Sequence, residues 1–175
     1  TMTITIDGSA SVTINSGAVL GLNSGTAVTL TTQTSVDFTS IPSWVKRITL
    51  MFSAVSSSGT ANYLIQLGDA GGIETTGYNV YGARYGSTSF AGTDFSNGFG
   101  ITSGNAANSL GGLIVFANVS GNTWVASGTF GDRASINAYL TTGAKILSDT
   151  LTQIRLTTVG GTETFDAGTI NILYE

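Results

Sequence analysis

Apolar and polar residues alternate with a period of two along much of this chain. The clearest case is residues 45–55, where one face would carry four apolar residues: Ile48, Leu50, Phe52 and Ala54. A period of two is that of a half-buried β-strand. No window keeps an apolar stripe at the helical spacing of 3.6 residues for three turns. The sequence therefore predicts an all-β protein.

Several further runs rich in Thr, Val and Ile are predicted to be strands: 63–67, 113–119, 123–130, 135–140, 153–158 and 169–174. Residues 113–119 are apolar on both faces, which predicts a strand covered on both sides. Ser120-Gly121-Asn122 and Gly160-Gly161 predict hairpin turns. Residues 35–175 are thus expected to form an antiparallel β-sandwich of jelly-roll type.

Residues 1–34 differ from the remainder because they contain a single charged residue, Asp7. Two short β-like repeats occur there, at 3–6 and 11–14. Such short strands cannot bury an apolar face by themselves. We therefore expect an N-terminal β segment over residues 1–34 that the main domain or neighbouring chains complete, and that contributes to assembly or attachment.

The residue types that carry most enzyme chemistry are missing. The chain has no histidine and no cysteine, and 9% of its residues are charged. Ser–His and Cys–His nucleophile pairs, disulfides and thiolate metal sites are therefore excluded. Paired carboxylates could still hydrolyse a glycoside, but no local motif proposes such a pair. The sequence predicts a protein that is not an enzyme and has no cofactor.

Charge and hydropathy exclude two further classes of partner. With six Lys and Arg residues, no basic stripe can neutralise several phosphates, so we expect no nucleic-acid binding. No apolar run approaches the ~18 residues that span a bilayer, so we expect no membrane insertion. No segment has the pattern of a signal peptide.

One segment carries a resemblance to a known class of proteins. Residues 35–52, Ser-Val-Asp-Phe-Thr-Ser-Ile-Pro-Ser-Trp-Val-Lys-Arg-Ile-Thr-Leu-Met-Phe, resemble a segment that recurs in virion proteins of tailed bacteriophages, often tail-fibre proteins. Residues 65–78 and 165–175 are similar to its continuation and closing strand. The resemblance implies a component of the phage particle surface that contacts other virion proteins and forms a homotrimer. It carries over no binding residue.

Aromatic residues gather in the glycine-rich zone from Gly68 to Gly112, where we expect irregular loops. We predict that five side chains meet there at one end of the sandwich and contact a host cell-surface glycan or protein: Tyr78, Tyr81, Arg84, Tyr85 and Asp94. Tyrosine offers a large contact area, and Arg with Asp gives directional hydrogen bonds. The alternative is that the phenylalanines of this zone, and some of the tyrosines, belong to the core.

Other residues have a structural and a functional interpretation that the sequence leaves open. Trp44 is expected in the core, with its indole N–H bonded. Asp37 is expected at a turn or strand entry. Lys46 and Arg47 fit either a solvated pair or a contact across a subunit boundary. Asp69 and Glu74 could bind a cation, but their spacing matches no calcium loop, so no metal is predicted.

Three functions remain as hypotheses. The first is a tail-fibre-type adhesion domain that binds a receptor on the host cell. The second is a purely structural component of the virion, such as a head-decoration or fibre-attachment protein. The third is a polysaccharide depolymerase. The aromatic zone favours the first, because binding residues are frequent on loops that a rigid scaffold positions.

Overall fold

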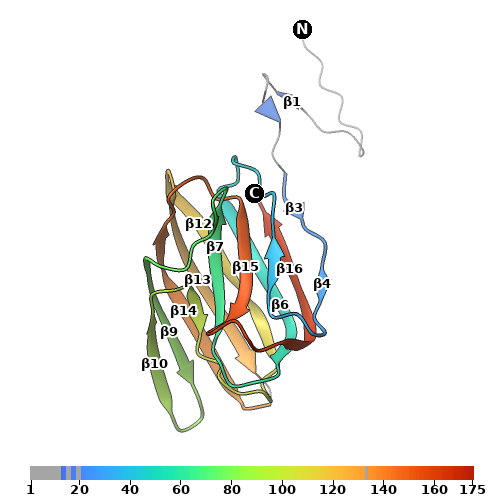
Figure 1. The fold of residues 1–175 in the computed structure, drawn as a ribbon, viewed down its shortest axis with the longest axis vertical. Helices are drawn as coiled ribbons and strands as arrows, with labels where there is room; N and C mark the ends of the chain where they lie inside the picture. Colours follow the sequence, from blue (N-terminus) through green and yellow to red (C-terminus); the bar gives the residue numbers. More distant parts are fainter. Residues whose placement is uncertain (1–12, 15–16, 19–20, 133) are drawn as a thin grey trace.

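Two antiparallel β-sheets pack face to face in this protein (Figure 1). The structure is a computed structural model that describes residues 13–14, 17–18, 21–132 and 134–175. Within these ranges there are strands, turns and irregular segments but no helix. The predicted all-β sandwich is confirmed. The jelly-roll order of its strands remains a prediction.

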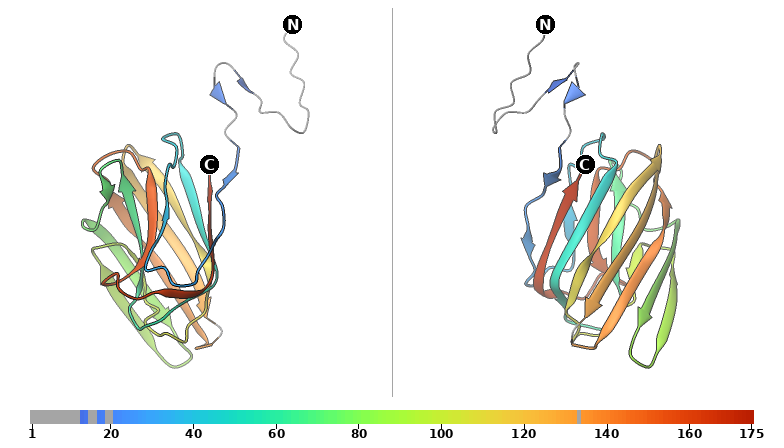
Figure 2. Two further views of the ribbon diagram at one scale, coloured as in Figure 1. Left: turned by 45° about the vertical axis from the view of Figure 1, so that its right-hand side comes forward. Right: turned by 180° about the vertical axis from the view of Figure 1, so that it is seen from behind.

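The larger sheet has nine strands. Across the sheet they run β10 (Phe90–Phe95), β9 (Tyr78–Tyr85), β14 (Asn137–Ile146), β13 (Thr123–Asp132), β12 (Leu110–Ser120), β6 (Arg47–Ser57), β16 (Phe165–Tyr174) and β3 (Asn23–Ser24), with β4 (Val28–Thr29) also on β16. The view from behind in Figure 2 shows its long strands lying side by side.

The smaller sheet has five strands and lies in front of the larger one in Figure 1. Its order is β11 (Phe99–Ile101), β7 (Tyr63–Asp69), β15 (Gln153–Thr158) and β5 (Val36–Phe38). The short strand β8 (Gly72–Ile73) pairs with the C-terminal end of β7. A separate pair joins β1 (Thr13–Ile14) and β2 (Gly17–Ala18).

The core lies between the inward faces of the two sheets. On β6, Ile48, Leu50 and Phe52 are buried as the alternation predicts, and Ile154 and Leu156 of β15 meet them from the smaller sheet. Buried aromatic rings pack edge to face, as in the pair Tyr63–Phe165, whose centroids are 5.3 Å apart. Burial raises the pKa of Tyr63 to about 12, so its hydroxyl stays neutral.

A β-bulge in β6 changes the predicted face at Ala54. Leu110 pairs with Val55 and Gly112 with Phe52, so Ser53 and Ala54 together oppose Gly111. Ala54 has a positive φ of 52° and is exposed, and Val55 takes the inward position. The expectation that Ala54 faces the core is therefore wrong.

Two other expectations about strands and turns are corrected. Residues 113–119 belong to β12, and the described residues of a single chain do not cover them on both sides, because the outer face of the larger sheet leaves Leu113 44% exposed. Gly160-Gly161 does not close a hairpin, since β15 and β16 lie in different sheets. The turn at Ser120-Gly121-Asn122 does join the neighbouring strands β12 and β13.

The described part of the expected N-terminal segment is joined to the sandwich. Strands β3 and β4 pair with β16, and Leu30 is 2% exposed within the core. The expected boundary between residues 34 and 35 therefore does not separate residues 21–34 from the sandwich. The repeat at 3–6 lies outside the described residues.

Candidate functional site

Strands β9 and β10 replace the loops predicted in the glycine-rich zone. Tyr81 and Asp94 are register partners, and Tyr85 pairs with Phe90. Strand β9 lies between β10 and β14 in the larger sheet, so its side chains alternate between the core and the outer face. The five predicted site residues consequently do not form one cluster.

Tyr78 belongs to the core and not to a binding surface. It is 6% exposed, and its ring lies 5.6 Å from that of Phe99 at 90°. Its hydroxyl accepts a hydrogen bond from the Leu67 N–H at 2.8 Å and lies 2.9 Å from the Glu74 carbonyl oxygen, to which it donates. Burial raises the pKa of Tyr78 above its ordinary value. The prediction that Tyr78 lies on a receptor-binding surface is wrong.

Replacing Tyr78 by Phe should therefore affect folding and leave binding unchanged. Tyr78→Phe leaves the buried Leu67 N–H without its partner, and we expect a loss of about 1–3 kcal/mol in the free energy of unfolding. Urea unfolding followed by tryptophan fluorescence measures this. The matched control is Tyr81→Phe, which removes a hydroxyl from a ring that is 39% exposed and should change stability by less than about 0.5 kcal/mol. Equal losses would contradict the assignment of Tyr78 to the core.

Arg84 also differs from its predicted role. By alternation it lies on the inward face of β9, opposite Ala91 of β10 and Tyr139 of β14. Its Nε atom is buried and has no hydrogen-bond partner in the part of the chain that the structure describes. Arg84 therefore does not join the exposed tyrosines.

Tyr81 and Asp94 are exposed side by side on the outer face of the larger sheet. The Tyr81 ring extends diagonally over Gly92: a Cβ atom at that glycine would lie 2.0 Å from the Tyr81 hydroxyl oxygen. Glycine at 92 therefore makes room for the ring. Of the predicted site residues, these two are brought together.

Tyr85 lies further along β9, at the end of the β9–β10 hairpin. It is 50% exposed and packs on Phe90, which is 59% exposed, with ring centroids 5.1 Å apart. These rings form an exposed aromatic pair, and the β9–β10 hairpin that carries them lies at the end of the sandwich opposite to β3 (Figure 1). Tyr85 was predicted to be a site residue. Phe90 was not, because the phenylalanines of this zone were considered for the core.

An open hollow of about 820 Å³ lies beside Tyr85 on the outer face of the sheet. Its floor is a row of small residues on neighbouring strands, because Gly111 pairs with Gly131, Gly131 with Ala138, and Ala138 with Tyr85. We call this site the tip hollow and define it by the residues Ala54, Tyr85, Gly111, Gly131, Ile136 and Ala138.

Backbone strain is concentrated at the tip hollow. Three non-glycine residues in the described ranges have a positive φ, and two of them, Ala54 and Ile136, line this hollow with φ of 52° each. For a β-branched residue such as Ile136 this conformation is a true outlier. It presents an apolar side chain that is 77% exposed. Strained residues of this kind gather at ligand-binding sites.

The polar margin of the hollow is held by Asp132 and Asn137. Asp132 accepts hydrogen bonds from the backbone N–H groups of Ser109, Ala134 and Ser135. Burial by itself would raise the pKa of Asp132, but these hydrogen bonds outweigh it and hold the pKa below its ordinary value. The carboxylate is thus charged and braces the turn between β13 and β14.

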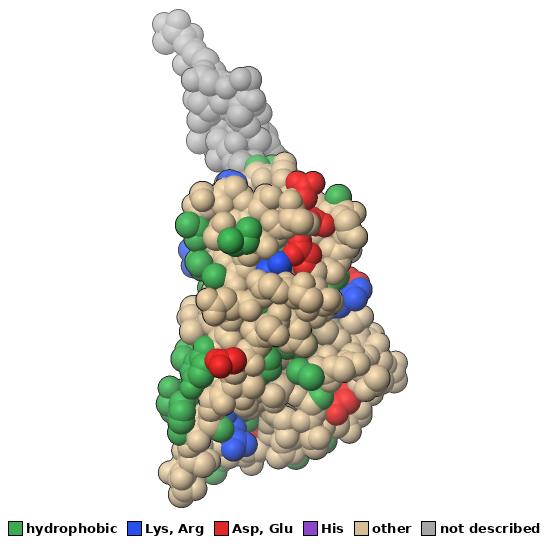
Figure 3. All heavy atoms as spheres, turned by 60° about the vertical axis from the view of Figure 1, so that its left-hand side comes forward, with side chains coloured by type: hydrophobic (Ala, Val, Ile, Leu, Met, Phe, Trp, Pro, Cys, Tyr) green, Lys and Arg blue, Asp and Glu red, His purple; other side chains and the backbone are tan. Residues whose placement is uncertain are grey.

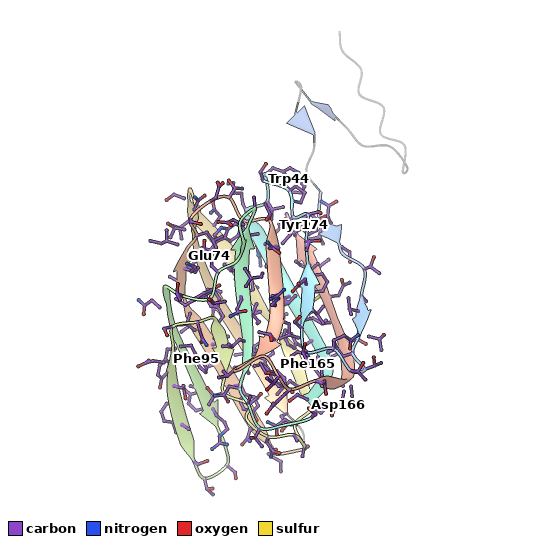
Figure 4. The ribbon with its side chains drawn as sticks, viewed as in Figure 1. Trp44, Glu74, Phe95, Phe165, Asp166 and Tyr174 are labelled. Carbon is purple, nitrogen blue, oxygen red and sulfur yellow. The ribbon has the colours of Figure 1, made fainter. Side chains whose placement is uncertain are left out.

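The two acidic residues considered for a cation are engaged by protein groups instead. The Asp69 carboxylate accepts hydrogen bonds from Ser148 Oγ and the Gly71 N–H, both at 2.7 Å, which lower its pKa. Glu74 (labelled in Figure 4) forms an ion pair with the buried Lys145. Burial acts to raise the Glu74 pKa, but Lys145 and Ser148 lower it on balance. In the described ranges no group of three or more metal-ligating side chains occurs.

The remaining candidates have structural partners. Asp37 lies within β5 and forms two hydrogen bonds of 2.7 Å with Arg155, so it is not a turn residue. Arg47 pairs with Glu175 at 3.3 Å. Trp44 is half-buried in a turn before β6, and its ring lies 6.0 Å from that of Tyr174 (Figure 4).

No protein-family model matches the chain, and no curated protein matches it significantly. In the described ranges there is no helix of the length and hydropathy needed to cross a membrane. A proposal of function therefore rests on the site and on the resemblance of residues 35–52 to virion proteins.

Proposed function

We propose that this protein is a structural component of a bacteriophage particle, of the tail-fibre type, and that its tip hollow binds a glycan on the host cell surface. In this proposal it works as a homotrimer on the particle surface, contacts other virion proteins and has no catalytic role. The observation that carries the binding role is the combination of strained residues, unconstrained glycines and the exposed ring of Tyr85 in one hollow.

The glycines of the floor support a ligand because the fold does not require them. Gly111 and Gly131 lie in strands and do not have a positive φ, and a Cβ atom at either would have no neighbour within 4 Å. Glycine within a strand costs about 0.5–1 kcal/mol relative to alanine. Such a glycine often marks a site where a ligand or another backbone approaches closely. The requirements of folding therefore do not explain why glycine occupies these two positions.

The Asp132 carboxylate at the margin is buried and bonded to backbone N–H groups, so the surface that the hollow offers suits a neutral ligand with a flat apolar face. Tyr85, Ile136 and Ala138 offer apolar surface, while Asn137 lies at the margin with a side-chain amide. The C–H face of a sugar ring can stack on an exposed aromatic ring, and a few polar groups at the margin fix its orientation. Figure 3 shows hydrophobic side chains near the lower margin of a surface that is mostly uncharged.

The position of the hollow is also consistent with an adhesion domain. The described N-terminal strands leave the sandwich at one end, and the β9–β10 hairpin reaches the other (Figures 1 and 2). A chain attached to a particle through its N-terminal side would present the tip hollow outward.

A purely structural role in the particle is the second candidate. It is favoured by the outer face of the larger sheet, on which Leu113, Val125 and Ile146 are 44%, 40% and 67% exposed. Exposed apolar surface of this kind marks protein–protein contacts. A decoration protein would need this face and no glycan site.

The test uses labelled protein on a panel of intact bacterial strains, followed by a glycan array. We expect binding to a subset of strains, competition by the glycans that bind on the array, and no shortening of those glycans on incubation. Binding to no strain and no glycan, together with binding to phage particles that lack the protein, would favour the decoration role. Shortened glycans would identify a depolymerase.

A further inference from the structure

The outer face of the larger sheet carries a second apolar surface, separate from the tip hollow. The outward side chains along the middle of β12, β13 and β14 are uncharged and mostly small or apolar: Leu113, Val115, Ala117, Val125, Ser127, Thr129, Leu140, Thr142 and Ala144. We call these residues the flat face. A solvated sheet face would be expected to carry charged residues among its polar ones.

A hollow of about 530 Å³ lies on the flat face, over Ala117 and Ala144. Val125 stands beside it and is 40% exposed. The surface therefore offers both a cavity floored by small residues and a side chain that could enter such a cavity. Both features are needed when a surface contacts a copy of itself.

The contact is centred on the line between β13 and β14. From this line the sheet continues through β14, β9 and β10 on one side and through β13, β12 and β6 on the other, and β16, β3 and β4 extend it beyond β6. A second copy can be related to the first by a twofold rotation about an axis that is parallel to this line and lies in front of the outer face. This rotation would bring β14 of one copy over β13 of the other, and β9 over β12. Near the axis, Ala144 of one copy would then oppose Val125 of the next, and Leu140 would oppose Thr129, so that small side chains face larger ones.

The charges at the two margins also match. Asp94 is exposed on β10, at one side. At the other side Lys46 and Arg47 are exposed; Lys46 donates a hydrogen bond to the Asn118 side chain, and Arg47 pairs with Glu175. The same rotation brings the acidic margin of one copy toward the basic margin of the next. Complementary margins fix the register of a contact and disfavour wrong partners.

We propose that the flat face binds a second copy of this chain, with the β9–β14 half of one copy against the β12–β13 half of the next. The contact ends at Leu113, Thr129 and Leu140, one row before the floor of the tip hollow, so the hollow stays open beside the contact. Because each copy has both halves, the pairing closes as a twofold dimer, so the mass of the assembly distinguishes this contact from the trimer of the proposed function. It does not depend on glycan binding.

Sedimentation equilibrium of the full chain tests the contact. Wild-type protein should have a mass of about 36 kDa, twice the 17.8 kDa of one chain. Val125→Lys places a charge in the flat face and should weaken self-association at least tenfold. The matched control is Val159→Lys, because Val159 is equally exposed at 40% but lies in the turn after β15. Unfolding curves of both variants identify any loss of folding.

A mixture of two variants tests which halves meet. Ala144→Glu should also weaken self-association, and mixing it with Val125→Lys should restore the larger mass, because the new charges meet between copies. A monomeric wild-type protein, or equal masses for Val125→Lys and Val159→Lys, would overturn the proposal. A mixture of well-folded variants that stays monomeric would overturn the pairing of the halves.

Discussion

A Phe116→Ala variant should lose about 3–5 kcal/mol in the free energy of unfolding. Phe116 is fully buried on the inward face of β12, and its ring packs edge to face on that of Phe99, with centroids 5.1 Å apart. Phe99 contacts Tyr78 in turn. Truncation therefore leaves a cavity in the centre of the sandwich, where the Phe99 ring of β11 would lose its contact with Phe116.

The matched control is Phe90→Ala, which removes the same side chain from the exposed aromatic pair. Because Phe90 is 59% exposed, its truncation should cost less than about 1 kcal/mol. Urea unfolding at a fixed temperature measures both variants. Equal losses in the free energy of unfolding would contradict the assignment of Phe116 to the core and of Phe90 to the surface.

The strands that could be predicted from the sequence are those in which large apolar residues alternate with polar ones. Ile48, Leu50 and Phe52 face inward, as do Ile170 and Ile172. These strands have one face on the core and one toward solvent, so burial imposes the period of two on their composition. The all-β class followed from them.

Strands β9 and β10 were predicted as loops because glycine hides their pattern. Gly82 is buried, and a Cβ atom there would lie 2.7 Å from Phe95 and 2.8 Å from the Gly100 carbonyl oxygen. Glycine serves close packing at this position and not a turn. In the sequence alone the two uses of glycine look the same.

The tip hollow could not have been predicted as a site. Its floor is formed by residues on the strands β12, β13, β14 and β9. These residues are neighbours in the sheet, but most of them are far apart in the sequence. Ala54 joins it through a bulge that reverses the face predicted for this residue. Only Tyr85 carried a signal, as an aromatic residue among glycines. Tyr78 carried the same signal and is in the core.

The central claim is that the floor of the tip hollow is kept flat for a ligand. Gly131→Val adds two methyl groups and a methine to a position with open space in front of it and an ordinary strand conformation. Valine suits a strand better than glycine, so stability should stay the same or rise by about 0.5–1 kcal/mol. Binding should nevertheless fall, because the new side chain occupies the hollow.

The most direct measurement is the affinity of Gly131→Val for the glycan or bacterial strain that wild-type protein binds best, with the unfolding curve taken on the same sample. Gly21→Val is the matched control, since Gly21 also has open space around it but lies away from the hollow. We predict a loss of affinity of at least about tenfold, equivalent to about 1.4 kcal/mol, for Gly131→Val alone, with no loss of stability. A Gly131→Val protein that binds as tightly as wild type would contradict the account.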